Sequence, residues 1–162
     1  EHAAQAQQDS AQGECVAVKW KGKIFICSKP NPSCLETIEE DGNLGEDIID
    51  FPEEKLKQLK GYFAHINLVN FRNKDELLVS FFKQDKNFEF LLYDIQSQDF
   101  EEDKISLIPQ DSPDGEKFQT VYSGFEQFEF NPNPEKPLSN IIIHSFRGET
   151  PQLIPCEIKV GA

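Results

Sequence analysis

The sequence contains no methionine, one tryptophan and no long hydrophobic run. Its apolar stretches fall far short of the roughly 20 residues that a membrane-spanning helix needs, so we expect the chain not to span a membrane. Basic residues are also scarce: 16 Lys and Arg stand against 29 Asp and Glu, a net charge of −13. This charge repels phosphate backbones, which disfavours nucleic acid as a partner, and it favours encounters with basic partners or cations.

Motifs of catalysis and nucleotide binding are missing from the sequence as well. It has no GxSxG elbow, no HExxH, no Walker-type loop and no GxGxxG. His65 and His144 sit within apolar segments predicted to be strands, where a histidine is more often structural than catalytic. We therefore expect a protein that is not an enzyme and that has no cofactor. Because 29 acidic residues make a carboxylate pair easy to assemble, an extracellular hydrolase stays an alternative.

The four cysteines favour disulfides over a metal or redox site. Cys15, Cys27, Cys34 and Cys156 are separated by 11, 6 and 121 residues, whereas zinc sites and CxxC motifs need closer pairs. Cys27 can close on Cys34 around a proline-containing turn, or strand parity can pair Cys27 with Cys156 and leave Cys15 for Cys34. Disulfides indicate an oxidising compartment, and the missing initiator methionine agrees with a removed signal peptide. We predict a secreted, extracellular protein, or one in another oxidising compartment such as the periplasm.

Alternating apolar residues predict a mainly antiparallel β protein. The segment 14–28 reads as a hairpin that turns at Lys21-Gly22. Further strands are expected at 62–71, 76–83, 87–94, 104–108, 117–123, 127–130, 140–146 and 153–160. Their close spacing leaves no room for the helices that connect parallel strands. We predict a disulfide-stabilised sandwich or closed barrel of about 8–10 strands.

One short helix is predicted near residues 51–60. Asp50 is its expected cap, and Glu53 lies three residues later, as a capping box requires. Gly61 is placed to end the helix.

The rest of the chain gives the predicted domain organisation. Residues 1–13 are polar and rich in Ala and Gln, and we expect a flexible mature N-terminus there. A single β domain is predicted over residues 14–162. Within it, residues 29–50 are expected to be a connector that carries an acidic patch.

Two acidic loops are candidate binding sites. The binding candidates are Glu39, Glu40, Asp41, Glu101, Glu102 and Asp103. Weak Ca²⁺ binding is a further hypothesis, with candidate ligands Asp41, Asn43, Asp47, Asp99, Glu101 and Asp103. The first loop departs from an EF-hand, because Glu46 replaces the Gly of its sixth position and Pro52 the Glu of its twelfth.

These features predict a secreted, non-catalytic β domain that binds another macromolecule, namely a protein, through its acidic loops. The alternative is a carrier that encloses a small apolar ligand, since the 14 phenylalanines can line a cavity as well as fill a core. The segment VKWKGK at residues 18–23 resembles lipocalin-type carrier barrels, although it lacks their Gly-x-Trp order.

Overall fold

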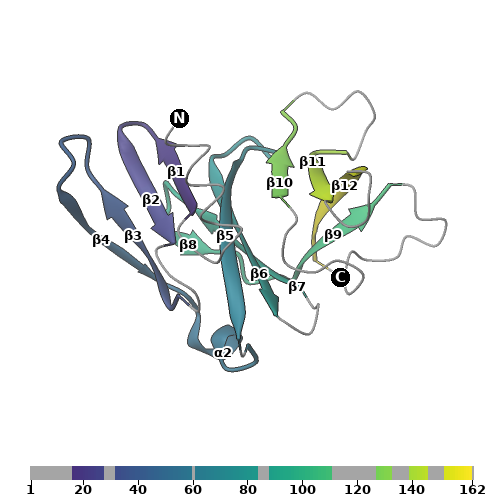
Figure 1. Ribbon diagram of the computed structural model, residues 1–162, viewed down its shortest axis with the longest axis horizontal. Helices are drawn as coiled ribbons and strands as arrows, with labels where there is room; N and C mark the ends of the chain where they lie inside the picture. Colours follow the sequence, from purple (N-terminus) through teal and green to yellow (C-terminus); the bar gives the residue numbers. More distant parts are fainter. Residues whose placement is uncertain are drawn as a thin grey trace. The chain divides into compact units, whose positions relative to one another are not determined.

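The computed structural model describes residues 16–27, 32–59, 61–83, 88–110, 127–132, 139–145 and 152–161 (Figure 1). Three predictions lie outside these residues: the flexible N-terminus at 1–13, the half-cystine at Cys15 and the strand at 117–123. The chain divides into two compact units, the first ending at Ile66 and the second beginning at Asn67. The single domain over 14–162 stays a prediction.

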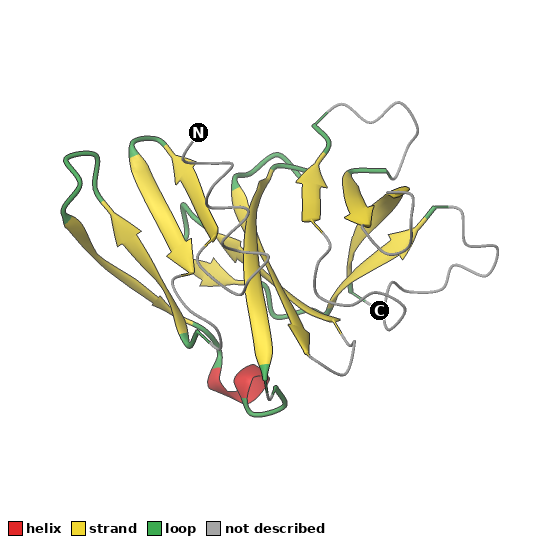
Figure 2. Cartoon of the chain, viewed as in Figure 1, coloured by secondary structure: helices red, strands yellow, loops and turns green. Residues whose placement is uncertain are grey.

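The first unit contains one four-stranded sheet (Figure 2). Its strands are β1 (Val16–Trp20), β2 (Lys23–Cys27), β3 (Cys34–Ile38) and β4 (Leu44–Asp50), paired antiparallel in the order β1-β2-β3-β4. The β1–β2 hairpin confirms the turn predicted at Lys21-Gly22. Both residues have positive φ, 44° and 79°, the conformation that a two-residue hairpin turn requires.

The prediction of a connector over residues 29–50 is wrong for β3 and β4. Strand propensity is low for Asp and Glu, which fill this segment. Packing overrides that propensity, because Leu35 of β3 and Ile49 of β4 lie opposite each other and are buried. Two apolar residues on the inner face therefore hold a hairpin whose other side chains are largely acidic.

The predicted helix is present but short. It is α2 (Glu53–Leu56), with Pro52 at its N-cap and no side-chain cap. The capping role of Asp50 is wrong, because Asp50 pairs with Cys34 in the β3–β4 ladder. The backbone N–H of Phe51 extends this ladder by donating to the Ser33 carbonyl at 3.0 Å, so the chain is still extended where the helix was expected to begin.

The core of the first unit lies on one face of its sheet and continues into the segment that follows. Its buried residues are Phe25, Cys27, Leu35, Ile49, Phe51, Leu59, Tyr62, Ala64 and Ile66. The hydroxyl of Tyr62 donates to the Pro32 carbonyl at 2.6 Å. This hydrogen bond attaches the residues just before β3 to the core.

The remaining strands form two more four-stranded sheets. One has the order β5-β6-β7-β8, from β5 (Tyr62–Val69), β6 (Glu76–Lys83), β7 (Phe88–Asp94) and β8 (Asp99–Phe100). The other has the order β10-β11-β12-β9, from β9 (Ile105–Pro109), β10 (Gln127–Phe130), β11 (Ile141–Ser145) and β12 (Gln152–Val160). The boundary between the two units falls within β5.

The core of the second unit is built around β6 and β7, where residues 76–81 and 90–93 are buried on both faces of the sheet. Leu77, Leu78 and Val79 are consecutive and fully buried. The two sheets meet in this unit, since β7 contacts β9 and the rings of Phe90 and Phe128 lie 6.2 Å apart. The prediction of a mainly antiparallel β protein with one short helix is thus confirmed for the described residues. None of the helices in that part of the chain is long and apolar enough to cross a membrane.

Candidate binding site

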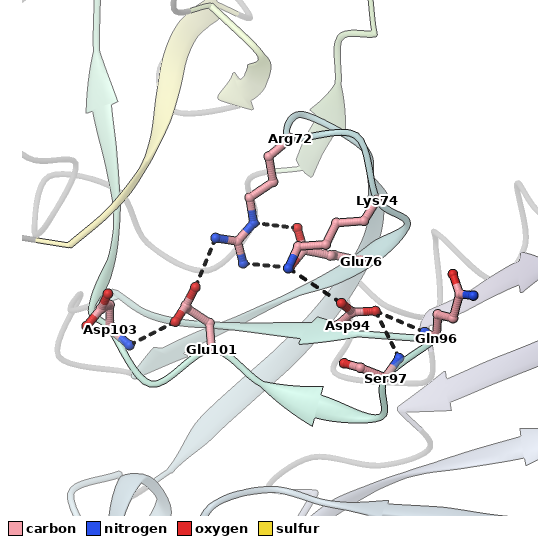
Figure 3. A network of polar contacts seen from close by, with 8 residues as sticks. All are labelled: Arg72, Lys74, Glu76, Asp94, Gln96, Ser97, Glu101 and Asp103. Atoms are coloured by element: carbon pink, nitrogen blue, oxygen red, sulfur yellow. Dashed lines mark hydrogen bonds and ion pairs between the residues drawn. The ribbon is translucent and has the colours of Figure 1, made fainter.

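The second acidic loop contains Glu101, Glu102 and Asp103. It is bonded to a buried ion pair (Figure 3). Arg72 lies in the turn between β5 and β6, and Glu76 begins β6. The guanidinium donates from Nε and Nη2 to the two carboxylate oxygens of Glu76, at 2.8 and 2.7 Å. Its Nη1 donates to Oε1 of Glu101 at 2.9 Å. One arginine therefore holds two carboxylates from distant parts of the sequence.

The charges of this cluster compensate one another. Glu76 is only 1% exposed, so its carboxylate depends on Arg72 for the interactions that water supplies elsewhere. The hydrogen bond to Glu76 raises the pKa of Arg72, against a lowering by burial. The hydrogen bond from Arg72 is the main cause that lowers the pKa of Glu101, and the backbone N–H of Asp103 adds to it at 3.3 Å. The carboxylate of Glu101 is therefore charged, but its charge is already compensated by Arg72.

The turn between β7 and β8 is fixed by Asp94. Its Oδ1 accepts hydrogen bonds from the backbone N–H groups of Gln96 and Ser97, at 3.0 and 3.2 Å. Lys74 lies 3.5 Å from its other oxygen. Burial raises the pKa of Asp94, but these hydrogen bonds and Lys74 outweigh it, so the pKa is lowered.

The first acidic loop is the turn of the β3–β4 hairpin, which we call the acidic hairpin (residues 34–50). The Glu39 N–H donates to the Asn43 carbonyl and the Gly42 N–H to the Glu39 carbonyl, both at 2.9 Å. Asp41 accepts from the backbone N–H of Asn43 at 2.9 Å and from its Nδ2 at 3.0 Å. Two candidate Ca²⁺ ligands, Asp41 and Asn43, are thus brought together, but as a bonded pair that shapes the turn.

The base of the acidic hairpin contains a bulge. The register shifts between Glu36 and Ile38. Buried Thr37 donates from Oγ1 to the Asp47 carbonyl at 2.9 Å. A Cβ added at Gly45 would overlap this hydroxyl, so glycine allows the backbone of β4 to come this close to β3.

The acidic hairpin carries a large excess of negative charge. It contains seven carboxylates and no Lys or Arg; these are Glu36, Glu39, Glu40, Asp41, Glu46, Asp47 and Asp50. Lys23 of β2 reaches Asp47 at 2.8 Å, and this hydrogen bond is the main cause that raises the pKa of Lys23. Lys23 thus offsets one of the seven charges.

Two large apolar side chains are exposed on the same hairpin. Leu44 is 77% exposed and Ile48 is 63% exposed. Leu44 lies opposite Ile38, and Ile48 lies opposite Glu36. Their face is the one away from the buried Ile49. Among the described residues the other large hydrophobic side chain with this exposure is Leu153 of β12, so two of the three lie on β4.

The other candidate binding residues lie in the second unit. Asp99, Glu102 and Asp103 are exposed around the β8–β9 connection. In the described parts of the chain, no three His, Cys, Asp or Glu side chains are grouped so that they can hold a metal ion. Ca²⁺ binding at the six candidate ligands stays a prediction.

The cysteines described by the structure are not joined by a disulfide. These are Cys27, Cys34 and Cys156, so disulfide stabilisation is not shown for this part of the chain. The β2–β3 register, with Ile26 opposite Glu36, puts Cys27 on the buried face and Cys34 on the other face. This parity opposes a direct Cys27–Cys34 link. Burial raises the pKa of the Cys156 thiol to about 12.

The two strand histidines have different surroundings. Desolvation in β5 lowers the pKa of His65 to about 4. His144 of β11 lies 2.8 Å from a carboxylate oxygen of Glu129 on the neighbouring strand β10.

Sequence reasoning missed the Arg72–Glu76 pair and the exposed side chains of β4. The pair has a faint signal, an arginine and a glutamate four residues apart before an apolar run. Leu44 and Ile48 have none, because an apolar residue in a presumed connector gives no indication of its exposure.

Comparison of the chain with protein-family models, with curated proteins and with solved structures found no match. The candidate site therefore rests on its own geometry.

Proposed function

We propose that the protein is a non-catalytic binding protein and that the acidic hairpin is its binding surface for a positively charged macromolecule, namely a protein. The observation that carries the proposal is the hairpin's charge, seven carboxylates without a Lys or Arg, beside two exposed apolar side chains. A surface of one sign steers oppositely charged partners toward itself. Exposed apolar side chains supply the contact area that makes such encounters last.

The contrast between the two acidic loops supports this choice. Glu101 of the second loop is held by Arg72, whereas the acidic hairpin has seven carboxylates and no Lys or Arg of its own, and Lys23 of β2 pairs with one of them, Asp47. Buried Glu76 is likewise bonded to Arg72 at both oxygens, which does not favour a hydrolase built on it. The described strands are spread over three sheets, whereas the carrier alternative needs one closed barrel.

The test measures binding of poly-L-lysine, by fluorescence anisotropy, at low and at moderate salt. The hairpin variant combines Glu39→Gln, Glu40→Gln and Asp41→Asn, where asparagine keeps an oxygen for the turn. The matched control removes the same three charges from the second loop. It combines Asp99→Asn, Glu102→Gln and Asp103→Asn.

We expect the hairpin variant to bind about tenfold more weakly at low salt and the control to bind as the wild type does. Binding should weaken for wild type as salt rises, because exposed charges are screened. Equal losses in both variants would show that net charge alone acts, and the proposal would then be wrong.

The proposal includes an oxidising compartment and a disulfide framework, because four cysteines form an even set in a small β protein. Strand parity favours a partner other than Cys34 for Cys27. Mass spectrometry of the unreduced protein from its source, digested and mapped, should show cysteine-linked peptides. Four alkylated thiols would refute this part.

A further inference from the structure

The binding mode of the acidic hairpin follows from the position of β4. β4 is the terminal strand of its sheet, paired on one side with β3. A terminal strand presents backbone N–H and C=O groups along its other side, and these can pair with an added strand. With seven residues β4 is longer than most strands, so it offers a usable edge.

The usual devices that protect such an edge are largely missing from β4. Proteins place lysine, proline, bulges or very short strands at sheet edges. The sequence LGEDIID of β4 has no lysine and no proline. It does have the bulge next to Gly45, which confines regular pairing with β3 to residues 48–50 and to Leu44.

Side-chain positions indicate what an added strand should contain. Ile48 and Leu44 lie exposed on the outer face, beside half-buried Ile38. Cross-strand neighbours on one face pack against each other, so apolar residues belong opposite Ile48 and Leu44. Asp50 and Glu46 flank them, and lysine or arginine belongs opposite these carboxylates.

Charge also separates a foreign partner from a second copy of this chain. All ionisable residues of β4 are acidic, so two β4 strands placed side by side repel each other. The basic strand edge of the same sheet is β1, with Lys19 exposed next to the turn at Lys21. A net charge of −13 on each chain opposes head-to-tail association through that edge.

We propose that β4 binds an extended segment of a basic partner protein as an added β-strand. In this segment every second residue shares the outer face with Leu44, Glu46, Ile48 and Asp50, and these facing residues are alternately apolar and basic. This inference rests on the proposed function and names its partner. The backbone of the partner supplies the affinity, and its basic residues supply the selectivity for this edge.

The experiment uses the full chain and two synthetic peptides of equal charge. The first is acetyl-Lys-Thr-Val-Thr-Lys-Thr-Val-Thr-Lys-amide, which puts alternating lysine and valine on one face. The second has the same sequence with every backbone nitrogen N-methylated, which removes the N–H donors of both edges and leaves the charge unchanged. Isothermal titration calorimetry at low salt measures both affinities.

Two single variants locate the site without a change of charge. Ile48→Thr removes an exposed apolar side chain from β4 but keeps a β-branched residue. Leu153→Thr does the same at the exposed position of β12, where the wild-type side chain is 64% exposed.

Strand addition predicts that the N-methylated peptide binds at least about tenfold more weakly, and that Ile48→Thr but not Leu153→Thr weakens the first peptide. Equal affinity of the two peptides would overturn strand addition while leaving the proposed function intact. No binding of either peptide, with none of poly-L-lysine, would overturn both. Concentration-dependent dimers in sedimentation would assign the edge to a second copy, and would also overturn the inference.

Discussion

Removal of Arg72 should lower the free energy of unfolding of the second unit more than removal of any other single charge in the described residues. Arg72→Met keeps most of the side-chain volume but leaves the carboxylate of Glu76 without its partner. Glu76 is 1% exposed, so water does not replace the two hydrogen bonds of 2.8 and 2.7 Å. An uncompensated buried charge of this kind costs about 3–5 kcal/mol of the free energy of unfolding.

The double variant separates a lost attraction from a stranded charge. Arg72→Met with Glu76→Leu removes both charges, and apolar replacement of a buried pair is often neutral or stabilising. We expect it to recover most of the loss and to lie within about 1 kcal/mol of wild type. Lys74→Met is the matched control: Lys74 is exposed, 3.5 Å from Asp94, and its removal should cost less than about 1 kcal/mol.

The assay is urea unfolding followed by far-UV circular dichroism, with hydrogen exchange of β6 as a second readout for the second unit alone. A loss below about 1 kcal/mol for Arg72→Met would refute the reasoning, as would a double variant no more stable than Arg72→Met. Either result would mean that water or another group satisfies Glu76.

Three further predictions concern pH and packing. The pKa of His65 is about 4 in the folded protein, below its ordinary 6.5, so the unfolded state takes up a proton at a higher pH than the native state does. The free energy of unfolding should therefore fall by about 3 kcal/mol as pH drops from 6.5 to 4. His65→Gln should flatten this fall in urea titrations. The pKa of Glu101 is lowered in the folded protein, so its ionised carboxylate contributes stability at pH values above its ordinary pKa, and this stability is lost as pH falls through the folded pKa. Glu101→Gln should therefore reduce the acid sensitivity of unfolding below about pH 4.5. An unchanged pH profile would contradict the pairing with Arg72. Gly45→Ala should cost about 1–3 kcal/mol in thermal unfolding because its Cβ overlaps the Thr37 hydroxyl, and addition of Thr37→Ala should recover part of that cost; fully additive losses would contradict the overlap.

The sequence predicted those strands whose apolar residues alternate or run together. The β1–β2 hairpin follows from Lys21-Gly22 and the pairing of Val18 with Phe25. The segments 76–83 and 87–94 became β6 and β7, within one residue. Local periodicity was sufficient there because each strand buries enough apolar surface to reveal its period.

The sequence predicted the negative charge of the acidic hairpin but not its strands. β3 and β4 each bury few side chains, Leu35, Thr37 and Ile49 among them, so their alternation is hidden among carboxylates. The exposure of Leu44 and Ile48 depends on the sheet order, which places β4 at the end. Sheet order is a tertiary property, and no local pattern encodes it.

The Arg72 cluster shows the same limit for the second acidic loop. Glu101 is 29 residues from Arg72 in sequence, so nothing local to the loop indicates that its carboxylate is already bonded. From the sequence the two acidic loops look alike. They differ in contacts between residues far apart in the sequence, such as that of Glu101 with Arg72.

Binding of a basic partner to β4 is tested most directly by amide hydrogen exchange. The exchange is measured by mass spectrometry with and without the unmethylated peptide. We predict slowed exchange over residues 44–50, with β9 to β12 unchanged. Protection confined to other strands, or no protection at a saturating peptide concentration, would contradict the account.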